Sequence, residues 1–246
     1  MSPKRSNITP KQWEEFVASR RTTRDFLDTP VTQQVIDELL TDAMTAPSWS
    51  NTRPYLVAVA LGDKRDRISA ALVKRIDAMN AAKRGGLIAK LRFVVSGYWI
   101  TRSEYPVVKP YPKDLNPRRI AVGRGLYGAM GIGRGDWAAR DAQLRRNFEF
   151  FGAPVALFVF THKGLDEYSV SDAGFFLQNL LLSAHARGLG ACAQGMLAIW
   201  PGPVRAEFKV PKNYKLLVGV SLGYPSDAAV NDFEAERLPI EQIVIK

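Results

Sequence analysis

Three apolar runs, each about as long as a strand, recur along this 246-residue chain with helical sequence between them. They occupy residues 55–61, 155–160 and 216–224. Runs this apolar do not suit strands with one face in water, so they predict strands buried inside a sheet. Because helices and strands alternate, the expected fold class is an α/β (α+β) sandwich in which helices flank a mixed central sheet.

Two helices near the N-terminus carry clear start signals. Thr9 caps the first, with Pro10 at the first helical position and Gln12 three residues after the cap. Thr32 caps the second, whose apolar residues repeat at helical spacing and which we expect to end at Pro47.

Later helices are expected at about 64–83 and at 136–151. The most apolar helix is expected to begin with Ser171 or Asp172 as its cap and to end near residues 187–188. A helix this apolar is buried on most sides, so it predicts a central helix of the core or of a dimer interface.

The chain fits a single domain over residues 1–246. Its hydrophobic content of 46% can fill one large core, and no Gly/Ser or Pro tract resembles a linker. Residues from about 85 to 135 are the least regular part, rich in glycine and proline. Such a stretch inside a compact chain predicts a lid-like insertion.

The insertion contains a formal dinucleotide fingerprint, G-x-G-x-x-G, at residues 123–128. A nucleotide-binding βαβ unit needs a strand directly before this motif and an acidic residue about twenty positions after it. The sequence supplies neither, so we interpret the motif as loop or lid helix.

The sequence offers few residues that could bind a metal or act as a nucleophile. Cys192 is the only cysteine, which excludes an internal disulfide and favours a reducing compartment. His162 and His185 are the only histidines, and neither has a partner at metal or triad spacing. We therefore expect no metal site, and an inert buried thiol at Cys192.

Charge favours an anionic partner. With 34 Lys+Arg against 24 Asp+Glu the net charge is +10, which suits a phosphate-bearing cofactor, nucleic acid or an acidic membrane. The basic residues are scattered, and no nucleic-acid motif is present. We expect no nucleic-acid partner, although a basic nucleic-acid binder remains an alternative.

No targeting or spanning segment is evident. Residues 1–5 are not followed by an apolar signal core, and the longest apolar stretch, residues 153–160, is too short to cross a bilayer. We expect a soluble, cytoplasmic protein with no membrane partner.

Two short blocks carry the strongest functional signal. Residues 20–24, Arg-Arg-Thr-Thr-Arg, offer three guanidiniums and two hydroxyls, a set that suits one phosphate, although such a run also occurs as a solvated face. Residues 46–51, Ala-Pro-Ser-Trp-Ser-Asn, form a polar turn with a large flat aromatic surface.

In this order and spacing, the two blocks resemble the flavin-binding N-terminus of the FMN-dependent nitroreductase family, and the likeness runs from Arg20 to Val244. It implies an intertwined homodimer with one FMN in each of two interfacial sites. The cofactor-binding residues that it implies match positions in the family's motifs: Arg20 and Thr22 for the phosphate with Arg21 beside them, Arg24 for the pyrimidine ring, and Pro47, Ser48, Trp49 and Asn51 from the partner's turn.

Further positions follow from the same resemblance. Gln194 and Gly195 match the stretch whose backbone N–H faces flavin N5, and Arg237 matches a basic position that closes on the phosphate. Asn147 is assigned to the pyrimidine edge. Trp49 also has the alternative of an ordinary core or surface aromatic. Glu234 departs from the family pattern, which is often basic there, and we expect its carboxylate to stand solvated outside the phosphate pocket.

The resemblance implies an oxidoreductase that takes hydride from NAD(P)H and delivers it through FMN to a nitroaromatic or quinone-like acceptor by a ping-pong mechanism. No catalytic side chain is expected, because flavin N5 performs the transfer. Alternatives are a same-fold flavoenzyme acting in ene reduction, dehalogenation or flavin breakdown, and a non-catalytic flavin-binding protein.

Overall fold

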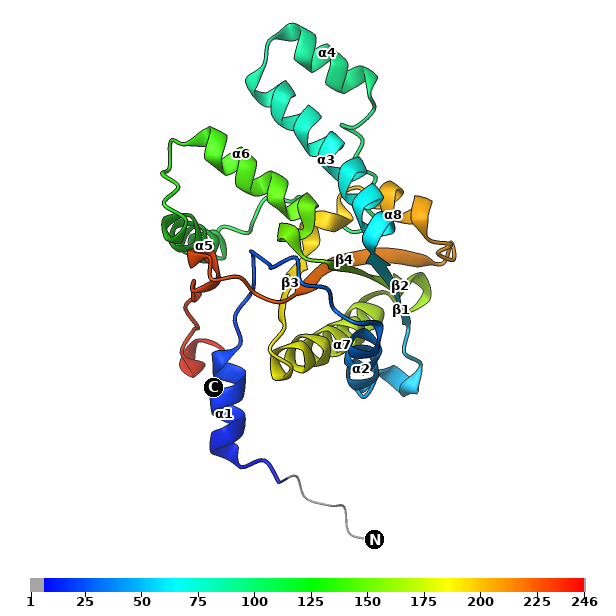
Figure 1. The fold of residues 1–246 in the computed structure, drawn as a ribbon, viewed down its shortest axis with the longest axis vertical. Coiled ribbons are helices and arrows are strands. Elements are labelled where there is room, and N and C mark those ends of the chain that lie inside the picture. The colour runs from blue at the N-terminus through cyan, green and yellow to red at the C-terminus, as the bar shows by residue number, and fades with distance from the viewer. Residues whose placement is uncertain (1–6, 246) are drawn as a thin grey trace.

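A four-stranded sheet forms the centre of the fold, seen in a computed structural model that describes residues 7–245 (Figure 1). Residues 1–5, discussed above for targeting, lie outside that range. The strands are β1 (Tyr55–Leu61), β2 (Val155–His162), β3 (Gly190–Gln194) and β4 (Tyr214–Gly223), in the spatial order β1-β2-β4-β3.

All three strand pairs in the described sheet are antiparallel, so the expected mixture of parallel and antiparallel pairs is wrong. An apolar run predicts that a strand is buried but says nothing of its direction. The connections between these strands are long enough to allow either direction.

Strand β2 lies in the middle of the sheet and carries its core. Its residues alternate between the two faces, with Phe158 and Phe160 on one and Leu157 and Val159 on the other, and all four are at most 1% exposed. Strand β1 is an edge strand and only partly buried, with Leu56 39% exposed. The prediction of a buried strand is therefore confirmed for β2 and too strong for β1.

Helices cover both faces. On one face lie α2 (Gln33–Ala43) and α7 (Asp166–Ala186), which bury Ile36, Leu39, Phe176 and Leu180 against the sheet. On the other face α3 (Gly62–Arg84) and α8 (Pro201–Glu207) pack over a second cluster. The described residues thus form the predicted sandwich of a sheet between two helical layers.

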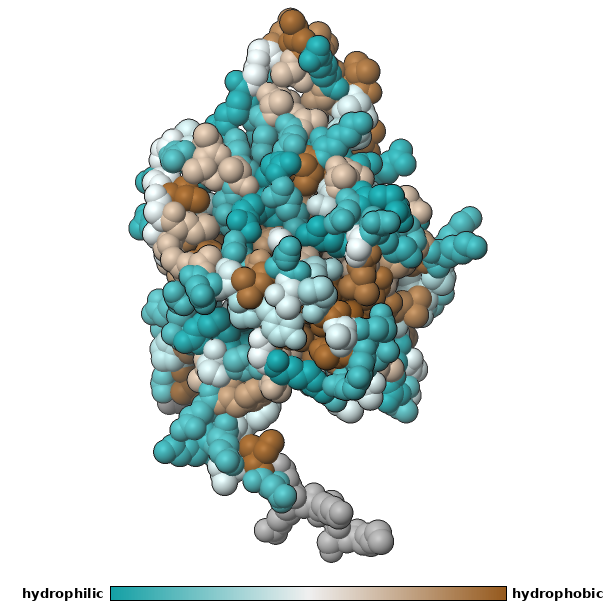
Figure 2. Space-filling view, in the orientation of Figure 1, coloured by the Kyte–Doolittle hydropathy of each residue, from teal (hydrophilic) through white to brown (hydrophobic). Residues whose placement is uncertain are grey.

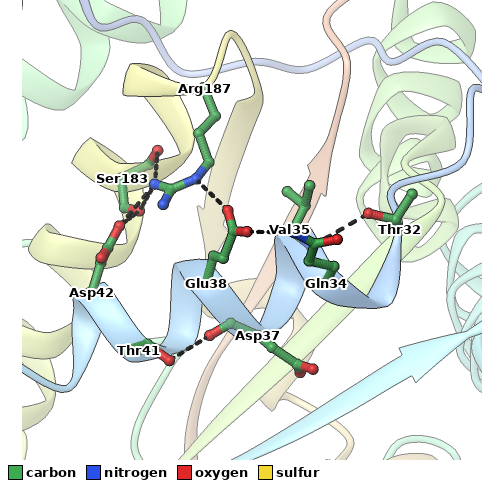
Figure 3. A network of polar contacts seen from close by, with 9 residues as sticks. All are labelled: Thr32, Gln34, Val35, Asp37, Glu38, Thr41, Asp42, Ser183 and Arg187. Carbon is green, nitrogen blue, oxygen red and sulfur yellow. Dashed lines mark hydrogen bonds and ion pairs between the residues drawn. The ribbon is translucent and has the colours of Figure 1, made fainter.

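Polar contacts join α2 to α7 (Figure 3). The Asp42 carboxylate accepts hydrogen bonds from Ser183 Oγ at 2.6 Å and from Arg187 Nη1 at 2.8 Å, and Arg187 also reaches Glu38 at 3.4 Å. These bonds join the C-terminal part of α2 to the C-terminal end of α7.

Helix α7 begins at Asp166, six or seven residues earlier than expected, so the prediction of a cap at Ser171 or Asp172 is wrong. Asp166 and Glu167 lie in its first turn, where their charge suits the helix dipole. Asp172 instead lies inside the helix and accepts a hydrogen bond from the Trp49 backbone N–H at 3.0 Å.

The N-terminal helices match their predictions closely. Helix α1 (Pro10–Ser19) has the capping box of Thr9 and Gln12 in full. Thr32 caps α2, which ends at Ala43 rather than at Pro47 because a short turn intervenes. Short 3₁₀ turns complete the chain: Trp49–Asn51, Asn147–Gly152, Lys163–Leu165, Gly195–Ala198, Ala229–Asn231 and Ile240–Gln242.

The stretch from 85 to 135 is more helical than expected. It contains α4 (Leu87–Val95) and α5 (Asn116–Ala129), and α6 (Trp137–Arg146) follows it. The G-x-G-x-x-G run lies wholly inside α5, with no strand directly before it, so it is a helix and not the phosphate-binding turn of a βαβ unit.

Helices α3 and α4 project from the body of the molecule (Figure 1). Figure 2 shows apolar side chains gathered at this end, where Leu87, Ile88 and Val95 are more than two-thirds exposed. The segment after α4 is anchored, since Tyr105 bonds Thr161 at 2.7 Å. Within residues 7–245, every helix is too short or too polar to cross a bilayer.

Candidate cofactor site

The basic block, residues 20–24, runs beside β3, where Gly190 leaves room for it. The backbone N–H of Thr23 donates to the Ala191 carbonyl at 3.2 Å. A methyl group at Gly190 would lie 2.2 Å from Thr23 Oγ1, so only glycine allows this approach. The contact holds the flanking arginines at the edge of the sheet.

Arg20 and Arg24 are the arginines available to a ligand. Arg20 is half-buried, and its Nη1 donates to the Arg21 carbonyl at 2.8 Å. Within residues 7–245, neither Arg20 nor Arg24 forms an ion pair with a carboxylate. Burial lowers the pKa of Arg20, and the charges of Arg237 and Arg21 lower it further. Neighbouring cations that have no carboxylate partner favour an anion between them.

Arg21 differs from its neighbours because it is already partnered. Its Nη1 donates to the Ala18 carbonyl at 2.7 Å, and its Nη2 lies 2.9 Å from a Glu234 carboxylate oxygen. Glu234 is 63% exposed and does not line the cavity beside the block, as expected for a solvated carboxylate outside the phosphate pocket, and it also pairs with Arg21. Thr22 is half-buried, and its side chain makes no hydrogen bond among the described residues.

A cavity of about 370 Å³ opens beside this block. His185 borders it and hydrogen-bonds Ser19 at 2.7 Å; burial and the charge of Arg20 lower the pKa of His185. The residues that line the cavity come from the ends of α1, α7 and β4: Ser19, Arg20, Arg21, Thr23, Leu181, His185, Gly188, Leu189, Gly190, Ala191, Pro225, Ser226, Asn231 and Asp232.

Asn231 ties the C-terminal tail to the basic block. Its side-chain oxygen accepts from the Arg24 N–H at 2.7 Å, and its amide donates to the carbonyls of Asp25 and Ser226 at 2.8 and 2.9 Å. Sequence reasoning missed this residue, because nothing local indicates that position 231 meets position 24. Arg237 follows six residues later, is exposed, and donates to the Ala235 carbonyl at 2.5 Å.

Asn147 and Gln194 meet, although they were assigned from distant parts of the chain. Gln194 Nε2 donates to the Asn147 carbonyl at 3.0 Å, and Gln194 Oε1 accepts from Ser221 Oγ. Gly195 follows at the end of β3, exposed, with room for a side chain: a methyl group there would meet only Val107, at 3.8 Å. Space alone does not therefore require glycine at this position.

The turn at residues 47–51 lies elsewhere. Trp49 is 53% exposed, so it is no core residue, and its ring lies 4.3 Å from that of Tyr168 on α7. Ser48 Oγ accepts from the Arg53 N–H at 3.0 Å, while Pro47 and Asn51 are exposed. The turn presents these side chains outward.

The turn and the basic block contact opposite ends of α7. The turn meets Tyr168 and Asp172, whereas the basic block lies beside His185. The thirteen residue steps from Asp172 to His185 span roughly 20 Å at 1.5 Å per residue. One chain therefore does not bring its own turn onto its own arginines.

The described residues do not favour thiol or metal chemistry. Cys192 is buried, as predicted, and burial raises the pKa of its thiol to about 11, which disfavours the nucleophilic thiolate. Among residues 7–245, no group of three or more His, Cys, Asp or Glu side chains is placed to hold a metal ion.

Known proteins share both the sequence pattern and the fold. A model of the nitroreductase family matches residues 17–224. The chain is 32% identical to a chloronitrobenzene nitroreductase of Comamonas testosteroni, over 93% of this chain and 94% of the relative. It is also 32% identical to a 4-nitrobenzoate reductase of Pseudomonas putida, over 92% and 91% respectively. The crystal structure of the FMN-dependent nitroreductase NfnB from Mycobacterium smegmatis in complex with NADPH matches with a TM-score of 0.78 at 29% identity, covering 95% of this chain and 97% of that one.

Proposed function

This chain belongs to the nitroreductase family, and from that premise we propose that it is an FMN-dependent oxidoreductase passing reducing equivalents from NAD(P)H to a nitroaromatic or quinone-like acceptor. One observation carries the proposal. Arg20 is half-buried near Arg237, and no carboxylate among the described residues balances its charge. A phosphate monoester supplies the missing anion.

The residues present fit FMN. Arg20, Thr22 and Arg237 would hold the phosphate, and Arg24 would stand near the pyrimidine ring, where its positive charge stabilises the negative charge of a reduced flavin. Gln194 and Gly195 would meet the ring from the C-terminal end of β3, and Asn147 from the turn that precedes β2. When bound, FMN supplies the hydride chemistry, accepting from NAD(P)H and donating to the acceptor.

We propose that the working unit is a homodimer. The turn that carries Ser48, Trp49 and Asn51 lies roughly 20 Å along α7 from the basic block, so a second copy must supply it. The half-exposed Phe175 and Tyr168 on α7 would be covered in that interface. The lone cysteine supports a cytoplasmic setting.

The segment from 85 to 135 would cap the acceptor cavity and select the acceptor. Val107 already lies within 3.8 Å of a methyl group built on Gly195, which brings this segment to the ring-binding strand. Its removal should change the range of acceptors while FMN remains bound. Loss of FMN on removal would contradict this division of roles.

The visible spectrum of the purified protein tests the function. We expect a yellow protein that bleaches when NADH or NADPH is added without oxygen and recovers its colour with a nitroaromatic acceptor. Replacing both phosphate ligands, Arg20→Ala with Arg237→Ala, should release FMN, whereas the exposed Arg134→Ala should not. A colourless protein that takes up no FMN would refute the proposal, and a yellow one that does not oxidise NAD(P)H would be a flavin-binding protein only.

A further inference from the structure

The C-terminal tail is attached to the rest of the chain at three consecutive points. Asn231 binds backbone groups of Arg24 and Asp25, as described above. Phe233 packs on α5, where a methyl group on Gly125 would lie 2.6 Å from its ring. Glu234 pairs with Arg21. Arg237 lies three residues beyond the last attachment.

The attachments act against a repulsion. Arg21, the neighbour of Arg20, holds Glu234 at 2.9 Å, and Arg237 lies three residues further along the tail, so the tail brings two like charges toward each other. The charge of Arg237 lowers the pKa of Arg20, and before an anion binds this repulsion favours movement of Arg237 away. The Arg21–Glu234 pair joins the residue after Arg20 to a tail residue three positions before Arg237, and it opposes that movement. It is the last of the three attachments before Arg237, and therefore the one with most control over its position.

The geometry of Arg21 leaves it poorly placed to bind phosphate as well. Its Nη1 is engaged by the Ala18 carbonyl at the end of α1, and its Nη2 is engaged by Glu234. The guanidinium therefore joins α1 to the tail. Arg20, by contrast, has one bond to a backbone carbonyl and no carboxylate partner among the described residues.

We propose that Arg21 and Glu234 form a clamp that positions Arg237 beside Arg20, so that Arg21 acts on the cofactor phosphate as a positioning residue rather than as a ligand. This inference rests on the proposed function, since the phosphate is that of FMN. It gives Glu234, an acidic residue beside an anion site, a role in favour of anion binding.

The sign of one substitution tests the clamp. Glu234→Gln removes a negative charge near the phosphate, which by simple electrostatics tightens FMN binding. If the clamp operates, the same change instead raises the dissociation constant of FMN by a factor of about two to five, the range for loss of an exposed ion pair. Glu236→Gln is the matched control: it removes the same charge two residues away and breaks no ion pair among the described residues. The measurement is the FMN dissociation constant of the full-length apoprotein, by quenching of flavin fluorescence.

A double-mutant cycle gives the second readout. If both partners act through one contact, the double variant Arg21→Met with Glu234→Gln weakens FMN binding no more than the single variant Arg21→Met does. Equal or tighter FMN binding in Glu234→Gln relative to Glu236→Gln would overturn the clamp, as would full additivity in the cycle.

Failure of the clamp is distinguishable from failure of the proposed function. If the wild-type protein binds FMN and Arg20→Ala releases it, the function stands whatever Glu234→Gln does. If the wild-type protein takes up no FMN, the clamp and the function both fall.

Discussion

Gln194 Nε2 donates a hydrogen bond to the Asn147 carbonyl oxygen at 3.0 Å, linking the end of β3 to the turn that precedes β2. Gln194 is only 4% exposed, and its oxygen accepts a second bond from Ser221 Oγ on β4. Both polar ends of this buried side chain are therefore satisfied within the protein. The residue holds three segments together where the flavin ring is proposed to bind.

Replacing Gln194 should therefore destabilise the apoprotein itself. Gln194→Ala leaves the Ser221 hydroxyl and the Asn147 carbonyl unpaired in a buried place, which costs about 1–3 kcal/mol of unfolding free energy. Urea denaturation of the cofactor-free protein measures the loss. Gln178→Ala, at an exposed position on α7, should change stability by no more than about 0.5 kcal/mol. Equal effects of the two substitutions would contradict the buried network.

A pair of glycines tests how the basic block is held. Gly190→Ala forces a methyl group against Thr23, so we expect a loss of about 1–3 kcal/mol from overpacking, together with weaker FMN retention. Gly174→Ala, on an open face of α7, should instead stabilise by about 0.5–1 kcal/mol. Thermal unfolding of both variants gives the comparison, and a neutral Gly190→Ala would mean that Thr23 does not pack there.

Local signals predicted much of the fold. The bounds of β1 were predicted correctly because Pro54 and Gly62 border a continuous apolar run. The start of α7 was missed because its first turn is polar, so no apolar repeat marks residues 166–170. The predicted helix at 136–151 stops at Arg146 and continues as a 3₁₀ turn, in which Phe150 and Phe151 have φ of 55°.

The residues of the candidate site could be proposed from the sequence, but the contacts between them could not. Arg20 and Arg24 belong to a local motif that sequence alone displays. The ion pair between Arg21 and Glu234 joins residues 213 positions apart, and no periodicity or spacing indicates such a meeting. Only the folded chain shows that one arginine of the block is occupied and its neighbour is not.

Cys192 should be unreactive in the native protein. With the pKa of its thiol raised to about 11, about one molecule in a thousand carries the thiolate at pH 8, and the side chain is only 4% exposed. A thiol-reactive chromogenic disulfide should label the denatured chain fully and the native chain hardly at all. Rapid labelling of the native protein would mean that β3 opens readily.

Asp42 makes stability depend on pH in a defined direction. The hydrogen bond from Ser183 and the guanidinium of Arg187 hold the pKa of Asp42 below its ordinary value. A carboxyl whose pKa is lowered by folding contributes stability above its unfolded pKa of about 3.9 and loses it as the pH falls through the lower folded value.

Asp42→Asn should therefore cost stability at pH 7, by less than about 1 kcal/mol because the side chain is 48% exposed. The cost should shrink as the pH falls from about 4 toward 2, because protonation of the wild-type carboxyl removes its charge too. Urea denaturation at both pH values measures this, with Asp28→Asn as a control that breaks no contact among the described residues. A deficit in Asp42→Asn that persisted unchanged at pH 2 would show that packing, rather than charge, joins α2 to α7.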